Sequence, residues 1–142
     1  MKETTLKHYL DGQASPLSVR AALEQIKGKQ SLSAYSNFVT DLEECHAVEV
    51  PDLIKLCDDF LNDTFDATDI RVIAFLLIAS DHFCWNTDTF PGNVVSEVLY
   101  DWYVAETNYP ITHENTATIK DGLLFNKYDP QLLKANSRRF AG

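Results

Sequence analysis

Basic residues are almost missing from the middle of this chain of 142 residues. Residues 30–119 contain sixteen acidic side chains but only two basic ones, Lys55 and Arg71, which gives this segment a net charge of −14. The flanking segments are weakly basic, so the whole chain carries a net charge of −9. A surface this acidic repels nucleic acid and anionic membranes and attracts basic proteins or cations. We therefore expect a basic protein partner, and no binding to nucleic acid or membrane.

Long apolar runs are missing as well. A transmembrane helix needs about 20 apolar residues. The most apolar stretch here is VIAFLLIA at residues 72–79, which Arg71 and Asp81 bracket closely. The N-terminal segment also lacks the apolar core of a signal peptide. The sequence therefore predicts a cytoplasmic protein.

Cysteines are few, and their spacing matches no metal motif. The chain has three, Cys45, Cys57 and Cys84, with no C-x-x-C or H-x-x-x-H pair of the kind that marks a strong zinc site. The nearest approach to a metal or catalytic cluster is Asp81-His82-x-Cys84. Each cysteine falls on an apolar helical stripe in a chain without a secretory signal. We therefore expect reduced, buried thiols and no metal site.

Motifs for catalysis and for cofactor binding are missing too. Ser80, Asp81 and His82 are the residue types of a hydrolase triad, but adjacent residues of a helix point in different directions, whereas a triad must converge. The sequence contains no glycine-rich phosphate loop, no H-E-x-x-H motif and no closed calcium loop. We expect no cofactor and no catalytic residue, and an α-helical enzyme stays as the weaker alternative.

What the sequence does contain is a series of helix signals. Four of the five prolines, at positions 16, 51, 91 and 130, stand where a helix would begin, a place that suits proline because its missing N–H would be unpaired there. Apolar residues recur with a helical period between these positions. The expected helices cover residues 3–10, 15–28, 33–45, 51–64, 68–85, 91–107, 112–120 and 129–139. The prediction is an all-α protein in which residues 1–142 form a single compact domain of seven or eight helices.

The helix expected at about 68–85 is predicted to be the centre of this domain. Its apolar side chains cover every side rather than one stripe, and such a helix must be surrounded by other elements. A buried strand is the rival interpretation of a short apolar run. The pattern continues through Phe83, Cys84 and Trp85, and this length favours a helix.

The acidic residues between positions 58 and 69 are the first candidate binding site. Asp66 and Asp69 suit the start of a helix, where the helix dipole favours negative charge. Asp58, Asp59 and Asp63 fall near a helix C-terminus, where negative charge is unfavourable. One interpretation is that these aspartates only form a solvated helix face and bind nothing. Residues that destabilise the helix on which they lie often have a functional role. We therefore predict that the acidic residues of this segment bind the partner, namely Asp58, Asp59, Asp63 and Asp66.

The outer face of the helix expected at 91–107 is the second candidate site. It presents Glu97, Tyr100 and Asp101, an aromatic side chain between two carboxylates. Exposed tyrosine is a common anchor in protein interfaces. We predict that these three residues also contact the partner.

A small, helical, acidic chain of this kind resembles the immunity proteins of bacterial contact-dependent growth inhibition systems. The likeness rests on size, helical layout and stretches such as LCDDFLNDTFDATD and SEVLYDWYVAE. It implies a cytoplasmic protein, monomeric on its own, that neutralises a toxin domain, frequently a nuclease. A nuclease site is rich in Lys and Arg because it holds phosphate, so an acidic surface could cover it. A helical scaffold or regulatory subunit that binds another basic protein is the alternative.

Overall fold

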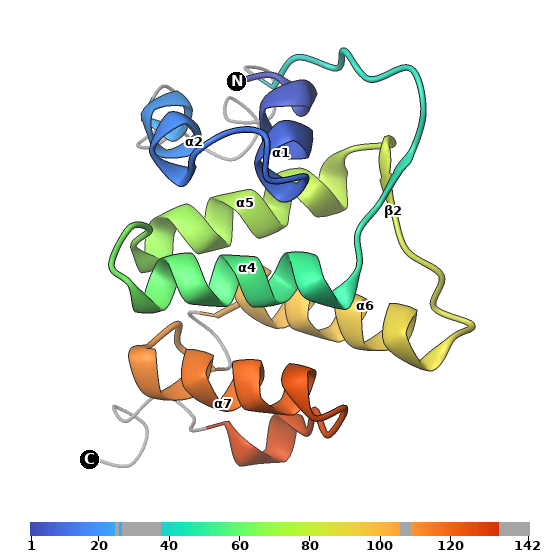
Figure 1. Ribbon diagram of the computed structural model, residues 1–142. Coiled ribbons are helices and arrows are strands. Elements are labelled where there is room, and N and C mark those ends of the chain that lie inside the picture. Colours follow the sequence, from blue (N-terminus) through green and yellow to red (C-terminus); the bar gives the residue numbers. More distant parts are fainter. Residues whose placement is uncertain (25, 27–37, 106–108, 134–142) are drawn as a thin grey trace.

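The computed structural model describes residues 1–24, 26, 38–105 and 109–133, and most of them are helical (Figure 1). The α-helices in this part of the chain are α1 (Glu3–Leu10), α2 (Pro16–Leu23), α4 (Val50–Leu61), α5 (Ala67–Ala79), α6 (Phe90–Tyr103) and α7 (His113–Leu124). A 3₁₀ helix, η1 (Pro130–Leu132), follows α7, and two short strands are β1 (His46–Ala47) and β2 (Phe83–Cys84). The mainly helical class is confirmed. Within the described residues there are six α-helices rather than seven or eight.

Proline marks the helix starts as the sequence predicts, with one exception. Pro16, Pro51 and Pro91 each lie in the first turn of an α-helix. The side chain of Thr89 caps α6 by accepting a hydrogen bond from the backbone N–H of Gly92 at 3.1 Å, which satisfies one of the free donors at a helix start. Pro130, in contrast, opens only η1. The backbone is extended again at residue 133, and residues 134–139 of the helix expected there lie outside the described part of the chain.

The helices pack in layers around one apolar core. Figure 1 shows α1 and α2 above α4 and α5, with α7 below α4. The closest packing pairs are α4 with α7 and α5 with α6. Buried side chains from all six helices join one cluster, which includes Leu6, Val19, Leu56, Leu77 and Leu123 among others. The acidic middle of the chain is therefore also the centre of the core.

Helix α5 differs from the prediction of an enclosed central helix. Ile73, Leu76 and Leu77 on one side are fully buried, but Val72 and Phe75 on another are only half-buried. The helix also ends at Ala79, so the expected continuation through residues 80–85 is wrong. Residues 83–84 form β2 instead.

The predicted helix over residues 33–45 is also wrong for its described part. Residues 38–45 form no helix. The backbone of Val39 pairs with the N-terminus: its carbonyl accepts from the N–H of Glu3 at 2.9 Å, and its N–H donates to the carbonyl of Met1 at 2.7 Å. The carboxylate of Asp41 then accepts from the backbone N–H of Thr4 at 3.0 Å. Residues 27–37 lie outside the described residues.

A short parallel ladder joins this extended segment to the turn after α5. His46 in β1 lies opposite Phe83 in β2, and Ala47 lies opposite Cys84. Residues near position 45 and residues near position 82 therefore become neighbours, although both α4 and α5 separate them along the chain.

Among the described residues, no helix is long and apolar enough to cross a membrane.

Gly92 is required by a close backbone approach at the start of α6. A Cβ atom there would lie 1.8 Å from the carbonyl oxygen of Asn86. We expect Gly92→Ala to lower the free energy of unfolding by about 2–3 kcal/mol, because the loop before α6 must move. Asn93→Ala, at an exposed position next to it, should change that free energy by at most about 0.5 kcal/mol. Urea unfolding of both variants tests the close approach, and equal stabilities would contradict it.

Candidate partner-binding surface

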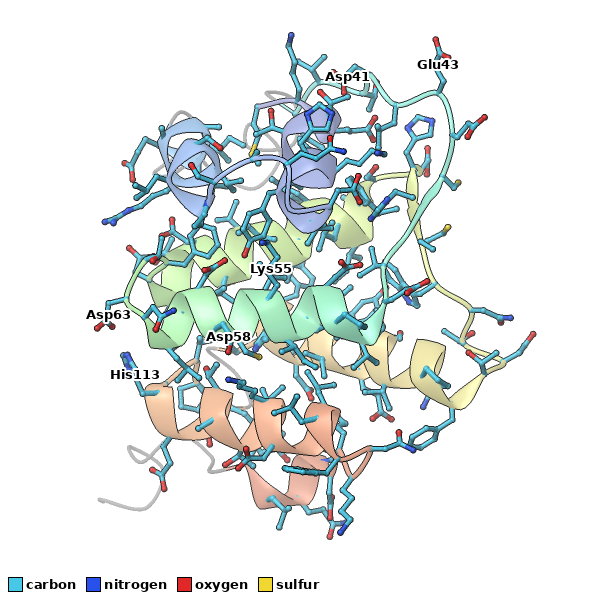
Figure 2. All side chains as sticks on the ribbon, viewed as in Figure 1. Asp41, Glu43, Lys55, Asp58, Asp63 and His113 are labelled. Carbon is cyan, nitrogen blue, oxygen red and sulfur yellow. The ribbon has the colours of Figure 1, made fainter. Side chains whose placement is uncertain are left out.

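Two of the three aspartates predicted as binding residues at the end of α4 contact α7. Oδ1 of Asp58 lies 2.6 Å from Nζ of Lys120. Oδ1 of Asp63 lies 2.8 Å from Nε2 of His113 at the first position of α7, and Figure 2 shows these two side chains facing one another at one end of the molecule. Both carboxylates therefore help to hold α7 on α4.

The third aspartate contacts α1. The Tyr9 hydroxyl donates a short hydrogen bond to Oδ2 of Asp59. The ring of Tyr9 is fully buried, packs edge-on against Phe65 with ring centroids 5.6 Å apart, and has Nζ of Lys55 4.9 Å from its centre. Burial, together with Asp59, raises the pKa of the Tyr9 hydroxyl further above its ordinary value of 10.0, so the hydroxyl stays protonated and donates to Asp59 even in mildly alkaline solution. The position of Asp59 near a helix end thus has a structural explanation.

Asp66 is the N-cap of α5. Its Oδ1 accepts from the backbone N–H of Asp69 at 2.8 Å, and Oδ2 of Asp69 accepts from the backbone N–H of Asp66 at 2.9 Å. This reciprocal pair satisfies two backbone donors of the first turn. The capping role expected of both residues is confirmed.

The predicted face on α6 divides into an outward and an inward part. Glu97 and Tyr100 are exposed, Tyr100 at 48%. Asp101 is half-buried, and its Oδ2 accepts from the Tyr128 hydroxyl at 2.7 Å. Burial raises the pKa of the Asp101 carboxyl even though this hydrogen bond opposes the shift. Glu97, whose Oε1 accepts from Nδ2 of Asn93 at 3.4 Å, and Tyr100 are the two predicted residues that remain exposed on this face.

A further group of carboxylates becomes visible only through the β1–β2 pairing. Cys45 Sγ lies 3.5 Å from the carbonyl oxygen of Asp81, so the chain segment that carries Glu43 and Glu44 runs close to the backbone at Asp81. All three acids are exposed, and their carboxylates have no hydrogen bond or ion pair with any residue that the structure describes. Figure 2 shows Glu43 pointing to solvent from the extended segment. We call Glu43, Glu44 and Asp81 the acidic edge.

Sequence reasoning missed the acidic edge because its members are far apart in the chain. Glu43-Glu44 is visible as a charged pair in the sequence, but the apolar pattern predicts that Asp81 lies in a helix. The two bases of the acidic middle do not neutralise the edge. Lys55 lies over the buried ring of Tyr9, and Arg71 is half-buried on α5.

A buried carboxylate, a serine and a histidine also meet, but not in the order that catalysis requires. Glu3 is fully buried. Its Oε2 accepts a short hydrogen bond from the Ser80 hydroxyl, its Oε1 accepts from the N–H of Leu42 at 3.1 Å, and its Oε1 lies 3.0 Å from Nδ1 of His82. In a hydrolase triad the histidine lies between the serine and the acid. Here the acid lies between the other two.

These hydrogen bonds decide the charge state of Glu3. Burial opposes ionisation, but the bonds from Ser80, Leu42 and His82 outweigh it, so the pKa of the carboxyl is lowered from its ordinary value of 4.5. Glu3 is therefore an anion inside the protein. It holds α1 to the segment before β1 and to the end of α5.

The cysteines differ from the prediction of three buried thiols. Cys57 is fully buried on α4, as expected, and burial raises the pKa of its thiol to about 12. Cys45 and Cys84 are exposed. Neither lies on a helix, because Cys45 precedes β1 and Cys84 ends β2. Within the described ranges, no group of three His, Cys, Asp or Glu side chains is placed to hold a metal ion.

Comparison of the chain with protein-family models, with curated proteins and with solved structures finds no match. Any functional assignment therefore rests on the chemistry of the surfaces described above.

Proposed function

We propose that this chain is a binding protein for a basic protein partner, and specifically an immunity protein that neutralises a toxin domain, such as a nuclease. The observation that supports the proposal is the acidic edge. Its three carboxylates are exposed and have no partner among the described residues, while Lys55 and Arg71 lie elsewhere. Unpaired surface charge of one sign attracts a partner of the opposite sign at little cost in desolvation.

Each of the surfaces described above has a distinct place in this mechanism. The acidic edge raises the rate of encounter with Lys and Arg side chains of the toxin. Tyr100 and Glu97 on α6 act as the anchor that slows dissociation, as exposed aromatic side chains do when a partner covers them. Asp58, Asp59 and Asp63 contribute negative charge near the partner, but their first role is to hold α1 and α7.

The test first looks for a toxin domain encoded beside this chain's gene and then uses that domain. Co-expression with the wild-type chain should restore growth, and the purified pair should bind. In the edge variant Glu43→Gln/Glu44→Gln/Asp81→Asn, we expect an unchanged melting temperature and association slower by roughly tenfold at low salt. The salt dependence of association should become shallower. Stopped-flow or surface plasmon resonance kinetics measure both.

Two matched variants separate charge from structure. Asp58→Asn/Asp59→Asn/Asp63→Asn removes the same number of charges but breaks contacts with α1 and α7, so it should lower the melting temperature. Tyr100→Ala should speed dissociation without slowing association. Growth that the wild-type chain does not restore, or a purified pair that does not bind, would refute the immunity function. Unchanged association kinetics in the edge variant would move the interface to another surface.

A further inference from the structure

The exposed cysteines form a pair that the sequence separates by α4 and α5. In a strand, side chains two residues apart point to the same face. Ala47 lies opposite Cys84, so Cys45 and Cys84 project from the same face of the β1–β2 ladder. Each thiol reaches the backbone of the other strand. Cys45 Sγ lies 3.5 Å from the carbonyl oxygen of Asp81, and Cys84 Sγ lies 3.8 Å from that of His46.

The neighbouring thiol also affects the ionisation of Cys84. Partial burial and the nearby Cys45 thiol raise the pKa of the Cys84 thiol. Both side chains are open to solvent, so a small oxidant can reach them. Cys57 differs in every respect, since it is fully buried and far along α4 from the ladder.

We propose that Cys45 and Cys84 are a reversible disulfide site, oxidised by a small disulfide such as glutathione disulfide. The thiolate of one cysteine attacks a sulfur of glutathione disulfide, breaks its S–S bond and releases one glutathione as its thiol. The second cysteine thiolate then attacks the protein sulfur of this mixed disulfide and releases the second glutathione. The protein loses two protons and two electrons, and glutathione disulfide gains them.

The bond would fasten the acidic edge. Cys45 follows Glu44 directly and contacts Asp81, so a disulfide fixes the extended segment to β2 beside the three carboxylates. The closed loop includes all of α4 and α5. Closing a loop of this length restricts the unfolded chain, so the oxidised protein should melt roughly 5 °C or more above the reduced one.

The experiment treats the reduced, folded chain with glutathione disulfide and follows its intact mass without reductant. We expect a loss of two hydrogen atoms, a disulfide peptide containing Cys45 and Cys84, and disappearance of the two thiols that react quickly with a chromogenic disulfide reagent. The reaction should accelerate as pH rises, because the thiolate is the attacking species. Dithiothreitol should restore both thiols.

Three variants keep the result interpretable. Cys57→Ala should form the same disulfide. Cys45→Ser and Cys84→Ser should instead stop at a mixed disulfide that carries one glutathione. A wild-type chain that ends with two glutathione adducts, or that forms only disulfides between chains at every protein concentration, would overturn the proposal. So would a chain in which neither thiol reacts.

Discussion

Replacing Glu3 with alanine is expected to lower the free energy of unfolding by about 3–4 kcal/mol, because it leaves buried donors without their charged acceptor. The carboxylate accepts from Ser80 and from the N–H of Leu42, and it contacts His82. Few substitutions outside the apolar core should cost as much. Urea or thermal unfolding at neutral pH measures the loss.

The pH dependence provides a second measure of the same contact. The pKa of Glu3 is lower in the folded chain than its ordinary value of 4.5. Its contribution to stability is therefore fully present above about pH 4.5 and is lost as the pH falls through the folded pKa. The wild-type chain should lose more stability than Glu3→Ala over this acid range. Glu43→Ala, which changes an exposed carboxylate, should follow the wild type, and parallel curves for all three proteins would contradict this role of Glu3.

Truncating Tyr9 is the second substitution with a large expected effect. Its side chain projects from α1, is fully buried, and contacts Asp59 and Lys55 of α4 and the ring of Phe65. We expect Tyr9→Ala to cost about 3–5 kcal/mol, as other buried aromatic side chains do when they are truncated in a core. Tyr9→Phe should cost only roughly 1–2 kcal/mol, because it keeps the packing but removes the donor to Asp59.

Two comparisons make the Tyr9 result specific. Tyr100→Ala removes the same kind of side chain from an exposed position, so it should change stability by about 0.5 kcal/mol or less. Tyr9→Phe combined with Asp59→Asn should cost less than the two single changes together, because both remove one contact. Additive costs for that pair would mean that the hydroxyl and the carboxylate do not interact.

The sequence predicts helix starts well and helix ends poorly, for a physical reason. The start of a helix is specified locally, by proline in the first turn and by a capping side chain such as Thr89 or Asp66. The end of α5 is specified from a distance. Ser80 adopts an extended conformation with ψ 137°, and its hydroxyl bonds Glu3, which lies 77 residues earlier in the sequence. The apolar residues continue with a helical period past residue 80, and this local pattern gives no information about the distant contact with Glu3.

The same carboxylate explains the failed helix prediction around residue 40. Apolar residues with helical spacing favour a helix over residues 33–45. In the described part of this segment, Leu42 instead donates to Glu3, and Asp41 accepts from Thr4. These contacts with α1 hold residues 38–45 extended, and local spacing cannot reveal them.

The candidate surfaces were predictable only in part. The net charge and the sign of the expected partner follow from composition alone. The sequence also identifies Glu97 and Tyr100, because the outer face of α6 is set by helical period. The sequence could not show which aspartates have partners inside the protein. Those contacts form only in the folded chain, where Asp58 meets Lys120, Asp59 meets Tyr9 and Asp63 meets His113. The acidic edge was hidden for the same reason.

The Glu3 contact also has a consequence for the order of events during translation. Ser80 follows Glu3 by 77 residues, and at ribosomal rates of about 5–20 residues per second it is made roughly 4–15 s later. During that interval Tyr9 of α1 can already contact Asp59 of α4, but Glu3 still lacks Ser80 and His82. The buried carboxylate can therefore be fully satisfied only after the whole of α5 has been made, and until then α1 is held by fewer contacts and is more open to chaperones and proteases.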